Sequence, residues 1–207
     1  MIAERAAERP FNMADLSAPL PPGYRRLAEG HEIAFGERRW IVRMGEGHAP
    51  EHVTLWSQDD DLVIGGDQLL ASISPNLGVH PNEPEGDPIG GWLTSCARLA
   101  EHARPDQLIL PGHRLPYRGL PTRLRQLIDN QRAALERLAA GLAGAPRTTV
   151  GCFDLLYRRV IGKPEFGLAL AEAVGHINHL RAAGRVWPVG QTEQGATLWG
   201  CLLYTSP

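Results

Sequence analysis

The chain has 207 residues, 43% of them hydrophobic and 21% charged, which excludes wholesale disorder and allows a sizeable core. Its 21 basic and 23 acidic residues give a formal charge of −2, so no electrostatic attraction to nucleic acid is expected. No apolar run approaches membrane-spanning length, residues 1–20 lack the apolar region of a signal peptide, and the 3 cysteines lie far apart. These features predict a cytoplasmic protein with reduced thiols and no membrane partner.

Residues 1–30 are rich in Ala, Arg and Pro without a sustained hydrophobic period, and we interpret them as a lead-in segment. A β-rich block begins at His31. Short β-prone runs separated by turn residues predict two hairpins in this block: Glu32–Phe35 with Arg39–Met44, and His52–Ser57 with Leu62–Ile64. The acidic turn of the second hairpin, Asp59-Asp60-Asp61, lacks the spacing of a calcium-binding loop and is predicted to be solvated.

A long loop and a helix come next. Residues 71–88 are rich in Pro, Gly and Asn, and a loop of this length inside a compact domain is more often functional than idle. The apolar stripe of residues 89–103 predicts a helix, and Gln107–Leu110 returns to strand. Strand, helix and strand in this order form a βαβ unit, so the block over residues 31–118 is predicted to be α/β.

Three potential metal ligands stand just beyond predicted strands, each close to a glycine: His48, Asp67 and His113. Strand ends in α/β folds are where functional side chains collect, because the sheet holds them around a shared crevice. Imidazole and carboxylate are ligands that zinc prefers in hydrolytic sites. Taken singly, each residue also has an ordinary interpretation as part of a surface turn, so the prediction rests on the three together.

These motifs resemble the second half of the metallo-β-lactamase-fold hydrolases: G-H-A-P-E-H at 47–52, G-D at 66–67 after the next strands, and P-G-H at 111–113. The resemblance implies the C-terminal half of an αββα sandwich around a site for two ions of zinc or of another divalent metal. It implies that His48 binds the first ion, that Asp67 bridges both ions, and that His113 binds the second.

The same resemblance suggests roles for residues around these ligands. His52, the second histidine of the turn, would pack behind the ligands, and Asn76 and His80 would belong to a substrate loop. The family opens its site with H-x-H-x-D-H, which supplies four further ligands. That string is absent here, and the first histidine is His31. The chain is therefore expected to be a fragment that binds zinc weakly and hydrolyses little by itself.

The C-terminal part is predicted to be helical. Leucines at three- and four-residue steps predict one long helix after Tyr117 that ends near Gly144, and the following segments are expected to form helices over 150–158 and 164–183 and a hairpin over 185–199. Three helices and a hairpin are typical of a winged helix. The run 171–186 resembles the small winged domain attached to one branch of these hydrolases. Residues 119–200 are therefore predicted to form a separable winged-helix-like domain whose hairpin packs beside the hydrolase block, and residues 201–207 to be a non-native tail.

The favoured function is that of a zinc-dependent hydrolase fragment. A metal-bound hydroxide would cleave an ester, thioester or amide-type bond in a small-molecule substrate. No catalytic residue beyond the metal ligands is assigned, and the sequence does not choose the substrate or the oligomeric state. Two alternatives stay open: a non-catalytic interaction protein on the same scaffold, and a DNA-binding winged-helix protein, against which the scarcity of clustered Lys and Arg on residues 164–183 argues.

Overall fold

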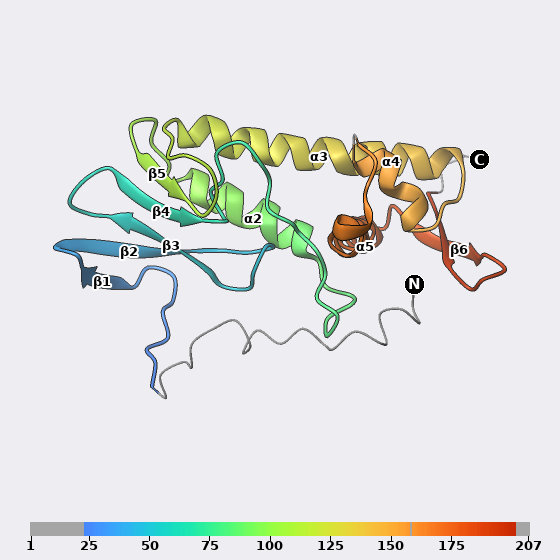
Figure 1. Cartoon of the computed structure of the whole chain (residues 1–207), viewed down its shortest axis with the longest axis horizontal. Helices are drawn as coiled ribbons and strands as arrows, with labels where there is room; N and C mark the ends of the chain where they lie inside the picture. The colour runs from blue at the N-terminus through green and yellow to red at the C-terminus, as the bar shows by residue number, and fades with distance from the viewer. Residues whose placement is uncertain (1–22, 158, 202–207) are drawn as a thin grey trace.

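The computed structural model describes residues 23–157 and 159–201 (Figure 1). Most of the predicted lead-in segment and the predicted tail beyond Cys201 lie outside the described residues. In chain order the elements are β1 (Glu32–Phe35), β2 (Arg38–Gly45), β3 (His52–Ser57), β4 (Leu62–Gly66), α2 (Pro88–Ala100), β5 (Leu108–Pro111), α3 (Leu120–Gly144), α4 (Phe153–Leu156), α5 (Phe166–Ala182), β6 (Trp187–Gln191) and β7 (Thr197–Gly200). Short 3-10 turns, η2 (Val150–Cys152) and η3 (Lys163–Glu165), precede α4 and α5.

Five strands form one sheet in the order β1-β2-β3-β4-β5, which contains the two predicted hairpins and the βαβ unit. The first four strands are antiparallel, and β5 runs parallel to β4 with α2 as the crossover. On one face Trp56 pairs with Val63, and Val63 pairs with Ile109. All three are buried in a core that they share with α2 and α3, which lie together on one side of the sheet (Figure 1).

Helix α2 begins at a cap that the sequence supplies, and it ends earlier than predicted. Asp87 accepts a hydrogen bond from the backbone N–H of Gly90 at 2.8 Å, which satisfies one donor of the first turn. The predicted helix extended to residue 103, whereas α2 ends at Ala100. Beyond Ala100 the backbone hydrogen bonds join residues three positions apart, as in a 3-10 turn. One example is the bond from His102 N to Leu99 O at 3.1 Å, and this turn ends the helix.

Helix α3 joins the two predicted parts of the chain. It runs along the sheet block at one end and along the C-terminal elements at the other (Figure 1). Its buried leucines belong to one hydrophobic core that includes residues from β3, α2, η2 and α5: Trp56, Trp92, Cys152 and Ile177. Packing is therefore continuous across residues 118 and 119, and the division into two domains stays a prediction. None of the helices in the described part of the chain combines the length and apolarity needed to cross a membrane.

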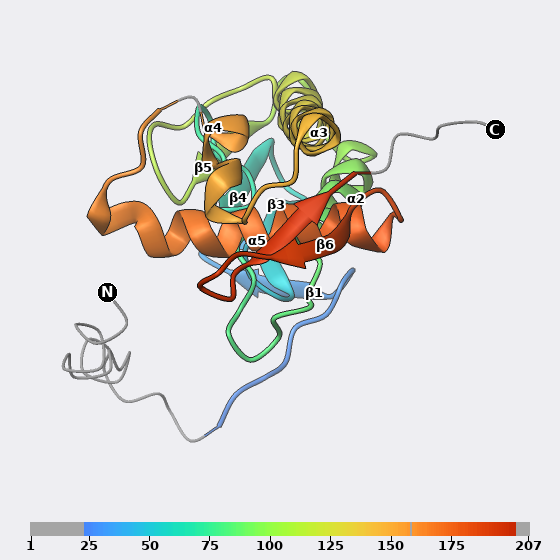
Figure 2. The same cartoon turned by 90° about the vertical axis from the view of Figure 1, so that its right-hand side faces the viewer.

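The C-terminal hairpin lies where the sequence did not predict it. The prediction that it packs beside the hydrolase block is wrong, because β6 and β7 lie at the end of the molecule opposite the five-stranded sheet (Figures 1 and 2). Helix α3 has 25 residues and a length of about 37 Å, so its last turn is far from the sheet. There Trp199 exchanges two backbone hydrogen bonds with Arg147, and Cys201 N donates to Leu142 O at 3.2 Å. Cys201, the first residue of the predicted tail, therefore takes part in the packing.

The order of helices and hairpin is as predicted in the C-terminal part, with small differences at the boundaries. The helix expected over 150–158 is a 3-10 turn followed by α4, and residue 158 lies outside the described residues. The helix expected over 164–183 begins with η3, and α5 follows from Phe166. Whether these elements form a winged helix stays a prediction.

Helix α5 packs on α3 through a neutral histidine. The side chain of His176 is buried, its Nδ1 donates to Glu172 O at 2.8 Å, and its Nε2 accepts from the Gln131 side-chain amide at 3.2 Å. One nitrogen donates and the other accepts, so both bonds require the uncharged ring. Burial lowers the pKa of His176 from 6.5 to about 4.

This buried histidine predicts a loss of stability in acid. In the unfolded chain the ring takes a proton near pH 6.5, whereas in the folded chain it stays neutral until about pH 4. The stabilisation is therefore complete above pH 6.5 and is lost as the pH falls toward about 4, by on the order of 3 kcal/mol. The measurement is the free energy of unfolding between pH 7 and pH 4 for the wild type and His176→Gln. The decline should be shallower in the variant, while His80→Gln, at an exposed position, should follow the wild type.

Candidate metal centre

His48 lies on the turn between β2 and β3, and close packing on α2 fixes this turn. Gly47 has a φ of +97°, and a Cβ there would lie 2.7 Å from Trp92 Cβ, so only glycine fits without displacing the helix. The backbone N–H of Glu46 donates to Ser95 Oγ on α2 at 3.1 Å. The turn that carries His48 is therefore bonded to α2 at Glu46 and packed against it at Gly47.

Asp67 follows β4 directly, and the ring of His52 packs against the end of that strand. Gly66 has a φ of +49°, and a Cβ there would lie 2.7 Å from His52 Cε1. The absence of a side chain at Gly66 thus makes room for the imidazole. Burial lowers the pKa of His52, and His48, whose ring centroid is 6.2 Å away, lowers it further, which favours the uncharged ring at neutral pH.

His113 follows β5, and the parallel pairing of β4 with β5 brings it to Asp67. Gly66 pairs with Pro111 in the register of the two strands, and Gly112 N donates to Gly66 O at 2.9 Å. A Cβ on Gly112 would lie 2.3 Å from Asp67 Oδ1. The two strand ends therefore touch through backbone, and glycine at 112 leaves space for the Asp67 carboxylate.

The three predicted ligands converge on the carboxylate of Asp67. His48 Nε2 lies 3.3 Å from Asp67 Oδ2, and His113 Nε2 lies 3.6 Å from Asp67 Oδ1. His48 Nδ1 lies 3.0 Å from the carbonyl oxygen of Asn76, which can only accept a hydrogen bond, so Nδ1 is the donor in this contact. Nε2 faces a carboxylate oxygen, and a contact at this distance requires a proton or a metal ion between the two atoms.

The donor set fits a divalent metal in kind, although it does not form a full ligand shell. Two imidazole nitrogens and one carboxylate are typical zinc ligands. The side chains of His48 and Asp67 are 30% and 26% exposed, and that of His113 is 65% exposed, so the centre opens to solvent on the His113 side. Within residues 23–157 and 159–201, no three His, Cys, Asp or Glu side chains are arranged to hold one ion together.

A pocket of about 720 Å³ opens beside His48. The loop of residues 71–87 forms one wall of this pocket, and both predicted loop residues, Asn76 and His80, line it. They differ in what they contact. The Asn76 carbonyl contacts the His48 ring, whereas His80 is exposed and accepts a hydrogen bond from the backbone of Asn82 at 3.3 Å. The volume is in the range of small-molecule pockets, about 300–1,000 Å³.

Two residues that the sequence analysis did not identify support the site. Gln68, next to Asp67, is buried and donates from its side-chain amide to Ser95 Oγ at 3.1 Å. A Cβ on Gly45 would lie 2.2 Å from Gln68 Cδ, so the amide fills the space beside that glycine. Ser95 thus ties the His48 turn and the Asp67 turn to one point of α2. In the sequence, the two glycines that flank Glu46, Gly45 and Gly47, were the only sign of this close packing.

Comparisons with known proteins place this fold and site in a family. The sequence profile of the metallo-beta-lactamase superfamily matches residues 3–144. The chain belongs to this superfamily, and the predicted α/β fold class is confirmed. The probable metallo-hydrolase YqjP of Bacillus subtilis is 27% identical over 161 residues, which cover 76% of this chain and 49% of that protein. Its description agrees with the class of protein predicted from the sequence.

Two solved structures resemble the chain along most of its length. A beta-lactamase domain protein from Burkholderia ambifaria has a TM-score of 0.84 at 37% identity and covers 91% of this chain. A metallo-beta-lactamase family protein from Thermus thermophilus has a TM-score of 0.73 at 27% identity and covers 90%. In both comparisons this chain covers 55% of the other protein. The chain therefore spans about half the length of the relatives it matches.

Because Gly112 lies so close to the Asp67 carboxylate, we predict that a side chain at position 112 destabilises the protein. In Gly112→Ala the new Cβ would overlap Asp67 Oδ1, so the carboxylate or the strand end must move. We expect a loss of about 1–3 kcal/mol in the free energy of unfolding, measured by chemical denaturation. Gly144→Ala, at the end of α3, is the matched control, because its Cβ would meet nothing within 4 Å. Equal stability of the two variants would contradict the close approach of β5 to Asp67.

Proposed function

We propose that this chain carries part of the active site of a zinc-dependent hydrolase that cleaves an ester, thioester or amide-type bond in a small molecule. The supporting observation is that each carboxylate oxygen of Asp67 faces the Nε2 of a different histidine, at 3.3 Å and 3.6 Å. A carboxylate between two imidazoles is suited to bridge two divalent ions.

Each side chain has a distinct task in this proposal. His48 and Asp67 would hold one ion, and Asp67 and His113 the other. When bound, zinc would lower the pKa of a water molecule and polarise the bond to be cleaved. The Asn76 carbonyl keeps the proton on His48 Nδ1, which leaves Nε2 free to bind. The pocket of about 720 Å³ beside His48 would receive the substrate.

The proposal includes ligands that this sequence does not supply. A catalytic zinc typically has three protein ligands, and the arrangement here gives two to each ion. The H-x-H-x-D-H string of the family is absent from the 207 residues, and the matched relatives are about twice as long. We therefore propose that further ligands come from sequence N-terminal to this chain, and that activity belongs to the longer protein.

Zinc content tests whether the metal site is complete in this chain or needs ligands from sequence upstream. The 207-residue chain and a version extended upstream along its genomic reading frame would be purified side by side. Bound zinc per chain and hydrolysis of a generic thioester and a β-lactam would be measured. We expect the longer protein to retain two zinc ions through gel filtration and to hydrolyse one of the substrates, and the short chain to do neither. Two tightly held ions on the short chain would show that other side chains, first His52 and His80, complete the site.

The role of Asp67 can be tested separately in the longer protein. Asp67→Asn keeps the shape but removes the charge that would bridge two ions, so we expect loss of at least one zinc per chain. The fall in kcat/KM should exceed the roughly 10- to 100-fold fall that is typical when a residue hydrogen-bonded to a metal ligand is mutated. Asp129→Asn, at an exposed position on α3, is the control and should keep both properties. Full zinc content in Asp67→Asn would contradict the bridging role.

A further inference from the structure

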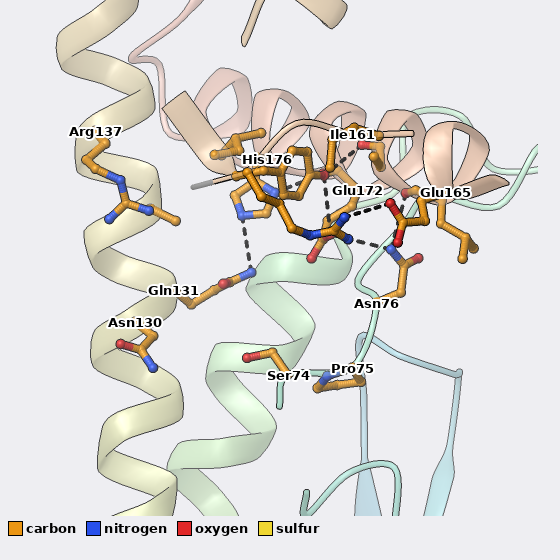
Figure 3. A pocket seen from close by; sticks show the side chains of 16 residues that line it. Ser74, Pro75, Asn76, Asn130, Gln131, Arg137, Ile161, Glu165, Glu172 and His176 are labelled. Carbon is orange, nitrogen blue, oxygen red and sulfur yellow. Dashed lines mark hydrogen bonds and ion pairs between the residues drawn. The ribbon is translucent and has the colours of Figure 1, made fainter. Parts of the chain in front are cut away.

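A second pocket, of about 540 Å³, lies between α3, α5 and residues 74–76 of the loop (Figure 3). Its volume is in the range of small-molecule pockets. None of the three predicted metal ligands lines it, so it is distinct from the candidate metal centre. It adjoins the pocket beside His48, because Asn76 and Leu168 line both. The charges in its wall decide which ligands it can bind.

Four charged side chains line this second pocket, and two of them neutralise each other. Glu165 and Arg159 form an ion pair at 2.6 Å. Arg137 projects from α3 and donates from Nε to the carbonyl oxygen of Leu155 at 3.2 Å, whereas Glu172 projects from α5 (Figure 3). Glu172 forms no ion pair within the described part of the chain. Its carboxylate is therefore the acidic group of the pocket that has no cationic partner there.

Neutral hydrogen bonds compensate only part of the charge of Glu172. Tyr157 Oη lies 3.3 Å from Glu172 Oε2 and 2.8 Å from Ala169 O. The hydroxyl has a single proton, and the shorter contact, with a carbonyl, takes it. Asn76 Nδ2 reaches the same Oε2 at 3.4 Å, a long hydrogen bond, while it also donates to Leu168 O at 3.2 Å. A carboxylate has about four acceptor sites, so this supply of donors leaves room for a ligand.

The enclosure of Glu172 makes a missing partner costly. Burial raises the pKa of Glu172, and the neighbouring Tyr157 hydroxyl and the backbone of Leu77 do not cancel this rise. An enclosed carboxylate is stabilised most by a cation that forms charge-assisted hydrogen bonds with it. A carboxylate with a perturbed pKa in the wall of a pocket is typical of a ligand-binding site.

We propose that the pocket between α3 and α5 binds the protonated amino group of a small organic molecule, with Glu172 as its counter-ion. A primary ammonium group has three donors, which the acceptor sites of the carboxylate can take. The apolar part of the ligand contacts Leu156, Ile161 and Leu168, which line the same pocket. This site lies on the C-terminal elements of the chain and needs no metal ion.

The position of this pocket extends the inference to the substrate. Because Asn76 and Leu168 line both pockets, a molecule anchored at Glu172 can reach the pocket beside His48. The substrate class that suits the two pockets together is an ester, thioester or amide that carries an amino group. This step rests on the function proposed above, whereas the amine site does not.

Binding is tested with pentylamine on the metal-free, 15N-labelled 207-residue chain by NMR titration. At about pH 8 an alkylamine is protonated, and pentanol has the same tail without the charge. We expect pentylamine to shift the side-chain amide resonances of Asn130 and Gln131, which line the pocket, with a dissociation constant of about 1 mM, since the ligand has few atoms. Pentanol should bind at least about 10-fold more weakly. Equal affinity for the two ligands would contradict the role of the charge.

Two variants remove the anchor in different ways. Glu172→Gln keeps the size of the side chain and removes its charge. Leu168→Lys places an ammonium group four residues before Glu172 on the same face of α5, where it competes with the ligand. Leu168 is exposed, so this variant still decides the matter if Glu172→Gln fails to fold. We expect the affinity for pentylamine to fall at least about 10-fold in both variants.

The matched controls make the same change of charge at exposed positions elsewhere. Asp129→Asn removes one negative charge from α3, and Val189→Lys adds one positive charge to β6. Both should bind pentylamine with the affinity of the wild type. Wild-type affinity in folded Glu172→Gln or Leu168→Lys would overturn the proposal.

Hydrolysis separates the amine site from the proposed function. In the upstream-extended protein, kcat/KM should be about 10-fold higher for the p-nitrophenyl ester of ε-aminocaproic acid than for that of caproic acid, and Glu172→Gln should lose this preference. Amine binding without a preference between the esters would overturn the substrate class and leave the amine site standing. Amine binding with hydrolysis of neither ester would count against the proposed function and not against the amine site.

Discussion

The parallel pairing of β4 with β5 is the interaction on which the candidate metal centre depends. Parallel strands end at the same edge of a sheet. The register pairs Val63 with Ile109, and a shift of one residue between Ile64 and Gly66 sets Gly66 beside Pro111. Asp67 and His113 follow these two residues and therefore become neighbours, although 46 positions separate them in the chain. The antiparallel hairpins could not produce this arrangement, because their strands end at opposite edges. The crossover helix α2 is thus both the reason for the parallel pair and the support for the His48 turn.

Helix α3 makes the C-terminal elements part of the same structure. Its leucines contribute to a core that extends from Trp56 on β3 to Val186 beyond α5. This continuity places α5 against the loop of residues 71–87 and so within reach of the centre. The composition of the sequence suggested two modules, and the local elements of each formed as expected. Hydrogen bonds between them join α5 of the second part to the loop of the first.

The sequence was sufficient for those features that follow from local pattern. Short β-prone runs predicted β1 to β5, leucine spacing predicted α3, and a glycine after a strand marked Asp67 and His113. The position of the hairpin was predicted wrongly, since the length of α3 decides it and no local pattern does. The contacts of Gln68, Ser95 and Glu172 could not be predicted either. Each joins segments that are distant in the chain, and the acceptor for His48 is a backbone carbonyl, which no residue type encodes.

The inward face of α5 carries three polar residues where stability alone would favour apolar ones. Glu172, His176 and Asn178 are each enclosed, and burial without partners would cost several kcal/mol in total, on the order of 1–3 kcal/mol for each group. Each instead satisfies donors or acceptors on another segment: Asn178 binds carbonyls of the loop, His176 accepts from α3, and Glu172 accepts from Asn76. Apolar side chains could fill the same volume, but they could not fix the position of an individual carbonyl or amide. All three polar residues are thus engaged inside the protein. Asn178 and Glu172 hold the loop against the helix, and this loop carries the Asn76 carbonyl that contacts His48.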